Sequence, residues 1–261
     1  MIDTRPLVLV TNDDGIVSEG IRQVATTLAH DYDVIVAAPA ADMSGAGTGI
    51  GRFDVEAGVE LTPVELDSVP RAYSIDGPPG LAVTAAALGA FGPVPDLVVS
   101  GINAGINTGH SVIHSGTVGA ALTAHTFSIR GLAVSVAQSD PWQWKTAAHY
   151  ASSAAGWMLS QRRRPFVLNI NVPALPVEEV KGVRWADLDE FGYFRVATAD
   201  LDDRRLQFVV GSRDNVSDPA SDTVLCQEGN VTITPLATVG PAPFPDIAAE
   251  EVVNRGKVSV S

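Results

Sequence analysis

Two adjacent aspartates, Asp13 and Asp14, come shortly after a buried-looking apolar run at residues 7–10. On a regular strand neighbouring side chains point to opposite faces, but a turn closed by Gly15 lets both carboxylates face one ligand. Oxygen ligands of this kind suit a hard cation such as Mg²⁺ or Mn²⁺ better than zinc. The competing interpretation is an Asx turn in which an aspartate caps the following helix.

A loop rich in glycine, residues 42–49, follows the next apolar run. Ser44 offers a hydroxyl oxygen, and Gly45 allows a backbone N–H group to approach a phosphate closely. The loop lacks the Gly-Lys-Ser/Thr ending of a P-loop. An ordinary flexible loop explains the same composition, so this segment alone does not decide between the two interpretations.

A third candidate is the Asn- and Gly-rich segment of residues 100–109, which contains Asn103 and Asn107. Asparagine carbonyl oxygens can ligate a hard cation, and asparagine amides can donate to phosphate. Because glycines are costly to order, such a loop suggests that something binds there.

The fourth candidate is the start of an Ala-rich helix at Ser115, Gly116 and Thr117. A helix N-terminus presents free N–H donors and a partial positive charge, which suit an anion. Plain helix capping by Ser115 or Thr117 is the alternative, and both roles can hold together. His110 and His114 precede this helix, and His114 is a candidate acid for protonating a leaving group.

The elements that must position these loops are alternating strands and helices. Buried apolar runs predict parallel strands, and helical spacing of apolar residues predicts the helices between them. This pattern predicts an α/β fold with a doubly wound, mostly parallel, Rossmann-like sheet, in which ligands bind beyond the carboxyl ends of the strands. Strands are expected at 7–10, 33–39, 96–101, 131–137 and 166–172, and helices at 21–28, 79–88, 115–127 and 142–160.

The pattern of alternating strands and helices ends near residue 182, where short strand-like segments follow one another. We expect a catalytic core over residues 1–181 and an extension over 182–236. In the extension, strands at 183–185, 193–196 and 205–210 form projecting antiparallel hairpins, and a strand at 231–236 returns to the core. Residues 237–261 are expected to form a tail or an oligomerisation arm.

Composition excludes several classes of protein. The 261 residues include 30 acidic and 17 basic ones, giving a net charge of −13, which argues against duplex nucleic acid as a partner. A hydrophobic content of 46% excludes global disorder. The single cysteine, Cys226, excludes an internal disulfide framework and a thiolate-rich zinc site. No signal peptide or membrane-spanning run is evident, so we expect a soluble cytoplasmic protein with no membrane partner.

Neither a Gly-x-Ser-x-Gly nucleophile elbow nor a Gly-x-Gly-x-x-Gly dinucleotide fingerprint occurs where its fold would need it. The four candidate loops, taken in order, instead resemble the survival protein E (SurE) family of metal-dependent nucleotidases. The matching segments are 7–16, 38–39 with 44–45, 98–105, 115–121, 169–173 and 232–236.

The resemblance implies hydrolysis of nucleoside 5′- or 3′-monophosphates to nucleoside and phosphate, with one divalent cation, Mg²⁺ or Mn²⁺, per subunit. It also implies a homodimer or homotetramer that exchanges hairpins and C-terminal segments. The implied metal ligands are Asp13, Asp14, Ser44 and Asn103, with the two aspartates also catalytic. Phosphate or substrate contacts are expected from Asn12, Gly45, Asn107, Ser115, Gly116 and Thr117.

The substrate rim departs from the family pattern. Met43 stands where the family usually has Arg, and His110, His114 and Thr123 replace other usual residues. Two alternatives therefore stay open: a specialised phosphatase for a non-nucleotide metabolite, and a nucleotide- or phosphate-binding module that has lost turnover. Arg52 is the nearest basic residue to the second loop, so phosphate binding is expected to depend on the cation and on backbone N–H groups.

Overall fold

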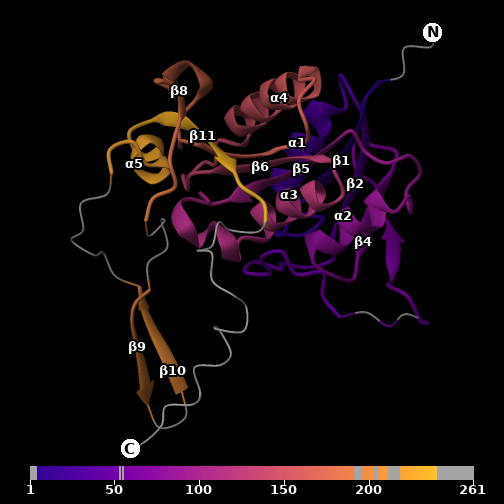
Figure 1. Cartoon of the computed structure of the whole chain (residues 1–261), viewed down its shortest axis with the longest axis horizontal. Coiled ribbons are helices and arrows are strands. Elements are labelled where there is room, and N and C mark those ends of the chain that lie inside the picture. Colours follow the sequence, from indigo (N-terminus) through magenta and orange to yellow (C-terminus); the bar gives the residue numbers. More distant parts are fainter. Residues whose placement is uncertain are drawn as a thin grey trace, which may run out of the picture.

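The structure of the chain is a computed structural model, and it describes residues 5–52, 54, 56–190, 196–202, 205–210 and 218–239 (Figure 1). For residues 196–202 and 205–210 only the backbone is described. The main-sheet strands are β1 (Leu7–Thr11), β2 (Asp33–Pro39), β3 (Leu61–Pro63), β4 (Ala72–Ile75), β5 (Leu97–Ala104), β6 (Arg130–Val136), β7 (Val167–Val172), β8 (Gly182–Trp185) and β11 (Asn230–Leu236).

These strands form one sheet in the order β3-β4-β2-β1-β5-β6-β7-β11-β8. All neighbouring pairs from β4 to β7 are parallel, whereas β3 pairs with β4, and β11 with β7, in the antiparallel direction. The prediction of a doubly wound, mostly parallel sheet is confirmed.

Helices cover both faces of the sheet. Helices α1 (Glu19–Leu28) and α4 (Trp144–Ser160) lie on one face, and α2 (Pro79–Ala87) and α3 (Gly116–Thr126) lie on the other (Figure 1). Because side chains alternate along a strand, Val8 and Val10 pack toward α1, while Leu7 and Leu9 pack toward α2 and α3. The shorter helices are η1 (Gly109–His114), η2 (Val177–Glu179) and α5 (Asp222–Gln227).

The topology creates a switch point between β1 and β5. The chain adds β2 and β4 on one side of β1, then crosses over and adds β5, β6 and β7 on the other side. At such a reversal the loops that leave the two central strands diverge and open a crevice at their carboxyl ends. The turn at residues 12–15 follows β1, and Asn103 lies at the end of β5, so the fold directs two candidate loops into this crevice.

The expected hairpin extension is partly wrong. A separate antiparallel hairpin does project from the body, formed by β9 (Val196–Asp202) and β10 (Arg205–Val210) (Figure 1). Strand β10 agrees with the prediction, but β9 begins at the residue where the expected strand 193–196 ends. However, β8 is not a hairpin strand, because it pairs in parallel with β11 at the edge of the main sheet. A parallel partner far along the chain leaves no local signal, so the sequence favoured a neighbouring hairpin.

Other differences concern short elements and undescribed residues. Strands β3 and β4 and helix α5 were not predicted, because elements of three to six residues are too short for a clear period. Residues 193–195 of one expected strand, and residues 240–261 of the expected tail, lie outside the described residues. The division of the chain at residue 182 stays a prediction.

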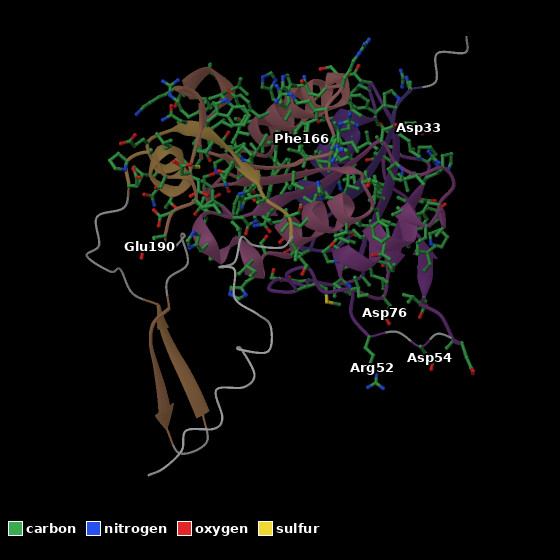
Figure 2. The ribbon with its side chains drawn as sticks, in the orientation of Figure 1. Asp33, Arg52, Asp54, Asp76, Phe166 and Glu190 are labelled. Atoms are coloured by element: carbon green, nitrogen blue, oxygen red, sulfur yellow. The ribbon has the colours of Figure 1, made fainter. Side chains whose placement is uncertain are left out.

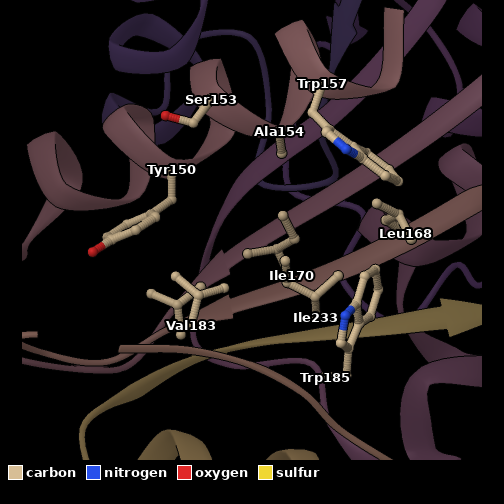
Figure 3. A pocket seen from close by; sticks show the side chains of 10 residues that line it. Tyr150, Ser153, Ala154, Trp157, Leu168, Ile170, Val183, Trp185 and Ile233 are labelled. Carbon is tan, nitrogen blue, oxygen red and sulfur yellow. The ribbon is translucent and has the colours of Figure 1, made fainter. Parts of the chain in front are cut away.

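An apolar groove lies where α4 faces strands β7, β11 and β8. Figure 3 shows Tyr150 and Trp157 of α4 opposite Ile170, Val183 and Trp185 of the sheet. The groove is lined by none of the predicted site residues. Within the described part of the chain, no helix has the length and apolar character to cross a membrane.

The core packing yields a stability prediction. Leu9 is fully buried in β1, so Leu9→Ala should lower the free energy of unfolding by about 2–5 kcal/mol through lost burial and the cavity left behind. Leu88→Ala is the matched control, because Leu88 is 75% exposed and its truncation should cost under about 0.5 kcal/mol. Urea unfolding measures both, and equal losses would contradict the assigned core.

Candidate active site

The turn after β1 is fixed by Asn12, whose side chain is fully buried. Its amide Nδ2 donates to the Gly15 carbonyl oxygen at 3.1 Å and to Ser18 Oγ at 2.6 Å. Ser18, and not an aspartate, caps α1 by accepting from the Ile21 N–H group. The capping interpretation of Asp13 and Asp14 is therefore wrong, and both carboxylates remain available for another role.

Asp13 is the buried carboxylate of the pair, with 3% of its surface exposed. The Thr117 hydroxyl donates to Asp13 Oδ1 in a short hydrogen bond, and the backbone N–H groups of Gly116 and Thr117 add to it. Burial raises the pKa of Asp13, while these hydrogen bonds lower it, and the net direction is upward. The carboxylate thus sits on the N-terminus of α3, the anion site that the sequence predicted for phosphate.

Gly116 is required at this contact by space. A Cβ atom added at Gly116 would lie 2.7 Å from Asp13 Oδ2 and 2.8 Å from Asp13 Cβ. Both distances are shorter than real Cβ contacts permit, so any side chain here would push the carboxylate away.

Asp14 is only partly buried and points toward the end of β5. Its Oδ2 atom accepts from the Ala104 N–H group at 3.3 Å. Burial raises the pKa of Asp14 to about 6, and the negative charges of Asp13 and Asp42 add to the rise. The two ion pairs among the described residues involve Arg22 and Arg71 and neither of these carboxylates. A bound cation would relieve this crowding of negative charge.

Asn103 contributes a third oxygen to the same place. Its Oδ1 atom lies 3.3 Å from Thr117 Oγ1, which also donates to Asp13. Its Nδ2 atom is occupied as a donor to the Gly105 carbonyl oxygen at 2.7 Å, which fixes the amide orientation. The Asn103 and Asp13 oxygens therefore share one neighbour, Thr117 Oγ1, which places both near the N-terminus of α3, and oxygens of this kind suit a hard cation.

The loop after β2 is tied to the site through its backbone. The Met43 N–H group donates to the Asp13 carbonyl oxygen at 2.7 Å. Exposed Ser44, however, donates its N–H to Asp42 at 2.7 Å, and its hydroxyl also hydrogen-bonds Asp42, which lowers the pKa of that carboxyl. The structure thus brings the Ser44 loop to Asp13, but no described contact links the Ser44 hydroxyl to the two aspartates.

The segment that leads into α3 is held mainly by structural contacts. Asn107 Nδ2 donates to Ser135 Oγ at 2.9 Å, and the backbone carbonyl oxygen of Asn107 accepts from the side-chain amides of Asn169 and Asn171 at 2.8 and 2.9 Å. Ser115 Oγ accepts from the Val118 N–H at 3.1 Å, so it caps α3 as the alternative interpretation held. These partners leave less of Asn107 and Ser115 free for a ligand than the sequence suggested.

The rim of the site is exposed. His110 and His114 both present their side chains to solvent, and Gly45 is exposed with a φ of +86°. The His114 carbonyl accepts from the Gly47 N–H at 3.2 Å, which joins the rim to the loop after β2. Arg52 extends away from the body on an outer loop beside Asp54 (Figure 2).

The contacts therefore bring together a subset of the predicted residues: Asp13, Asp14, Asn103, Gly116 and Thr117. Sequence reasoning missed Asp42, which affects Asp14 electrostatically. Its position just past the end of β2, beside the β1 turn, was the signal that could have found it.

Comparisons with known proteins agree with this geometry. The sequence model of the family described as "Survival protein SurE" matches residues 8–194. This chain belongs to the SurE family. A protein named 5'-nucleotidase SurE from Desulfitobacterium hafniense (strain DSM 10664 / DCB-2) is 36% identical over 233 residues, which cover 88% of this chain and 90% of the relative.

Another 5'-nucleotidase SurE, from Histophilus somni (strain 2336), is 37% identical over 243 residues, covering 88% of this chain and 92% of the relative. The crystal structure of the SurE protein from Aquifex aeolicus superposes with a TM-score of 0.75 at 26% identity, covering 88% of this chain and 93% of that one. The resemblance to SurE and the fold class predicted from the sequence are confirmed.

The Gly116 contact gives a prediction for this SurE protein. Gly116→Ala should weaken Mn²⁺ binding by about tenfold or more, because the new Cβ displaces Asp13. Gly156→Ala in α4 is the matched control, since its Cβ would meet only the Tyr32 hydroxyl at 3.3 Å. Titration calorimetry of both variants checks this, and wild-type affinity in folded Gly116→Ala would contradict the assigned geometry.

The crowding of carboxylates gives a prediction on stability. In the folded protein the pKa of Asp14 is raised from 3.8 to about 6, so its ionisation opposes folding increasingly as the pH rises from about 3.8, and the penalty is complete above about pH 6. Without divalent cations, Asp14→Asn should raise the melting temperature at pH 7, and the gain should vanish below about pH 3, where the Asp14 carboxyl is protonated in both the folded and the unfolded state. Thermal unfolding in chelator measures the difference; a gain that is independent of pH would count against the crowding.

Proposed function

We propose that this SurE protein is a divalent-metal-dependent phosphomonoesterase that hydrolyses nucleoside 5′- or 3′-monophosphates to nucleoside and phosphate. The observation that carries the proposal is the group of oxygens from Asp13, Asp14 and Asn103 at the switch point, set against the N-terminus of α3. The printed name of the relatives, 5'-nucleotidase SurE, supports nucleotides as the substrates.

The donor set fits one Mg²⁺ or Mn²⁺ ion per subunit. Asp13, Asp14 and Asn103 would hold it, with Ser44 after rotation of its hydroxyl away from Asp42. All four proposed ligands are oxygens, which suit a hard cation. Among the described residues no group of three or more His, Cys, Asp or Glu could hold a metal, so the proposed site depends on Asn103 and Ser44 beside the two aspartates. When bound, such a cation polarises a phosphoryl oxygen and lowers the pKa of a water molecule.

The side chains of this site would hold the metal ligand in place and move the protons of the reaction. Asp13 is held by Thr117 and by α3, so its role is to stay fixed. Asp14 is the more accessible carboxylate, and it would take the proton from the attacking water. His114 is exposed and directly precedes Ser115 at the start of α3, and it would protonate the leaving oxygen.

Substrate contacts would come from residues around the α3 N-terminus and the two flanking loops. Backbone N–H donors suit the charge that spreads over the phosphoryl oxygens in the transition state. The proposed contacts are Asn12, Gly45, Asn107, Ser115, Gly116 and Thr117. Of these, Asn12 now donates to Gly15 and Ser18, and Gly116 and Thr117 donate to Asp13, so these three would exchange present partners for the phosphate.

The exposed rim with His110 and His114 keeps a specialised phosphatase for a non-nucleotide metabolite as the second candidate. Specificity constants for a panel of nucleoside monophosphates and sugar phosphates separate the two. Tight phosphate binding without turnover on either panel would instead indicate a binding module.

The assembly is proposed to be a homodimer or homotetramer in the cytoplasm. Hairpin β9–β10 forms a sheet of its own, and an isolated two-stranded hairpin is only marginally stable in water. Packing against a second copy of the chain would stabilise it.

The proposal is tested with Asp13→Asn. In this variant the rate of Mn²⁺-dependent phosphate release from nucleoside monophosphates should fall at least about 100-fold. Even mutation of a residue that only hydrogen-bonds a metal ligand typically lowers metal affinity or activity by about 10–100-fold. Asp67→Asn is the matched control, because Asp67 is exposed in a distant loop and should keep wild-type turnover. Full activity in Asp13→Asn, or wild-type turnover that is unaffected by chelator, would refute the metal assignment.

A further inference from the structure

Asp222 is a fully buried carboxylate outside the site described above. It is the first residue of α5, between the projecting hairpin and β11. Its two oxygens accept from the Gly109 N–H at 3.1 and 3.0 Å, and Oδ1 also accepts from the Asp189 N–H at 3.0 Å. Gly109 lies 113 residues earlier in the chain, so this contact joins two distant parts of the molecule.

Helix α5 does not need this carboxylate for its own formation. Its N-terminal cap is Ser221, whose Oγ accepts from the Val224 N–H at 3.3 Å. Burial raises the pKa of Asp222, and the negative charge of Asp189 adds to the rise, so the charged side chain is kept here at a cost. Apart from Thr223 beside it, the described donors to Asp222 are the backbone N–H groups of two other loops.

Neighbouring contacts hold the same stretch of chain. Thr223 Oγ1 donates to Thr108 Oγ1 at 2.9 Å, and the His110 N–H donates to the Asp189 carbonyl at 3.0 Å. Three consecutive residues, 108 to 110, are thus fixed by residues that follow β8 or begin α5. All of these side-chain contacts are buried, so water does not compete with them.

This stretch leads directly into the site. Gly109 begins η1, which ends at His114, and Ser115 then caps α3. The next residues, Gly116 and Thr117, contact Asp13. A shift at Gly109 would therefore pass through one short 3₁₀ helix to the α3 N-terminus.

We propose that Asp222 is a positioning residue that holds the segment from Asn107 to Thr117 in the geometry that binds the substrate phosphate. The inference rests on the proposed function, because it assigns this segment to the phosphate. The metal ligands Asp13, Asp14 and Asn103 lie outside the stretch that Asp222 contacts. Asp13 is held by Gly116 and Thr117 at the far end of this segment, so loss of the Asp222 carboxylate should weaken phosphate binding most and cation binding to a smaller degree.

The test compares Asp222→Asn with Cys226→Ala. Asp222→Asn keeps the size of the side chain, but it replaces one carboxylate oxygen, an acceptor, by an NH₂ donor that faces the Gly109 N–H group. Cys226 is buried on the same helix, and no described hydrogen bond links it to residues 107–110, so Cys226→Ala perturbs α5 without breaking the contact. Steady-state kinetics with a nucleoside monophosphate, inhibition by inorganic phosphate, Mn²⁺ calorimetry and hydrogen exchange of residues 107–114 are measured for both.

For Asp222→Asn we expect KM and the inhibition constant of phosphate to rise about tenfold, with faster exchange over residues 107–114. The Mn²⁺ affinity should fall by a smaller factor than the phosphate affinity, and kcat should change less than KM. Cys226→Ala should lower the melting temperature and leave KM unchanged.

An active, folded Asp222→Asn with wild-type KM and exchange overturns the inference, as does an equal rise of KM in Cys226→Ala. If Asp222→Asn does not fold, Asp222→Ser replaces it, since its smaller neutral side chain no longer offers two carboxylate oxygens to the Gly109 N–H group; wild-type exchange and KM in folded Asp222→Ser overturn the inference too. If the wild-type protein releases no phosphate with Mn²⁺, the proposed function itself has failed, which is a separate result.

Discussion

The rest of the site depends on one contact, between the Asp13 carboxylate and the N-terminus of α3. Thr117 donates to this carboxylate, and Gly116 leaves the space that it occupies. A buried carboxylate is costly unless hydrogen bonds or a cation compensate it. The helix N-terminus supplies part of that compensation, and the remaining crowding with Asp14 and Asp42 makes the place attractive to a cation.

The doubly wound topology explains why these groups meet. Asp13 and Asp14 follow β1, and Asn103 ends β5, the two strands between which the order of the sheet reverses. The third loop, after β2, reaches the site because the Met43 N–H donates to the Asp13 carbonyl. The C-terminal part of the chain completes the arrangement, since Asp222 reaches back to the segment before α3.

Much of the fold followed from the sequence, because β-branched runs alternating with helical spacing are a local signal. The meeting of Asp13, Asp14 and Asn103 also followed, since the carboxyl ends of neighbouring parallel strands share one edge. Side-chain directions did not follow: Asn12 and Asn107 are occupied by structural partners, and Ser44 faces Asp42. The Asn12 and Ser44 contacts are local but depend on the exact turn geometry, which residue types do not fix. The Asn107 contact, the parallel pairing of β8 and the contact of Asp222 with Gly109 depend on residues far along the chain.

The central claim is that the oxygens at the switch point form one cation site beside residues 107–117, the segment proposed to bind phosphate. A crystal structure grown with Mn²⁺ and inorganic phosphate, measured at a wavelength where manganese scatters anomalously, tests it most directly. The account predicts one anomalous peak per subunit, ligated by oxygens of Asp13, Asp14 and Asn103, with phosphate between the metal and the N-terminus of α3. A fully occupied peak elsewhere, with these three residues binding no metal, would contradict it.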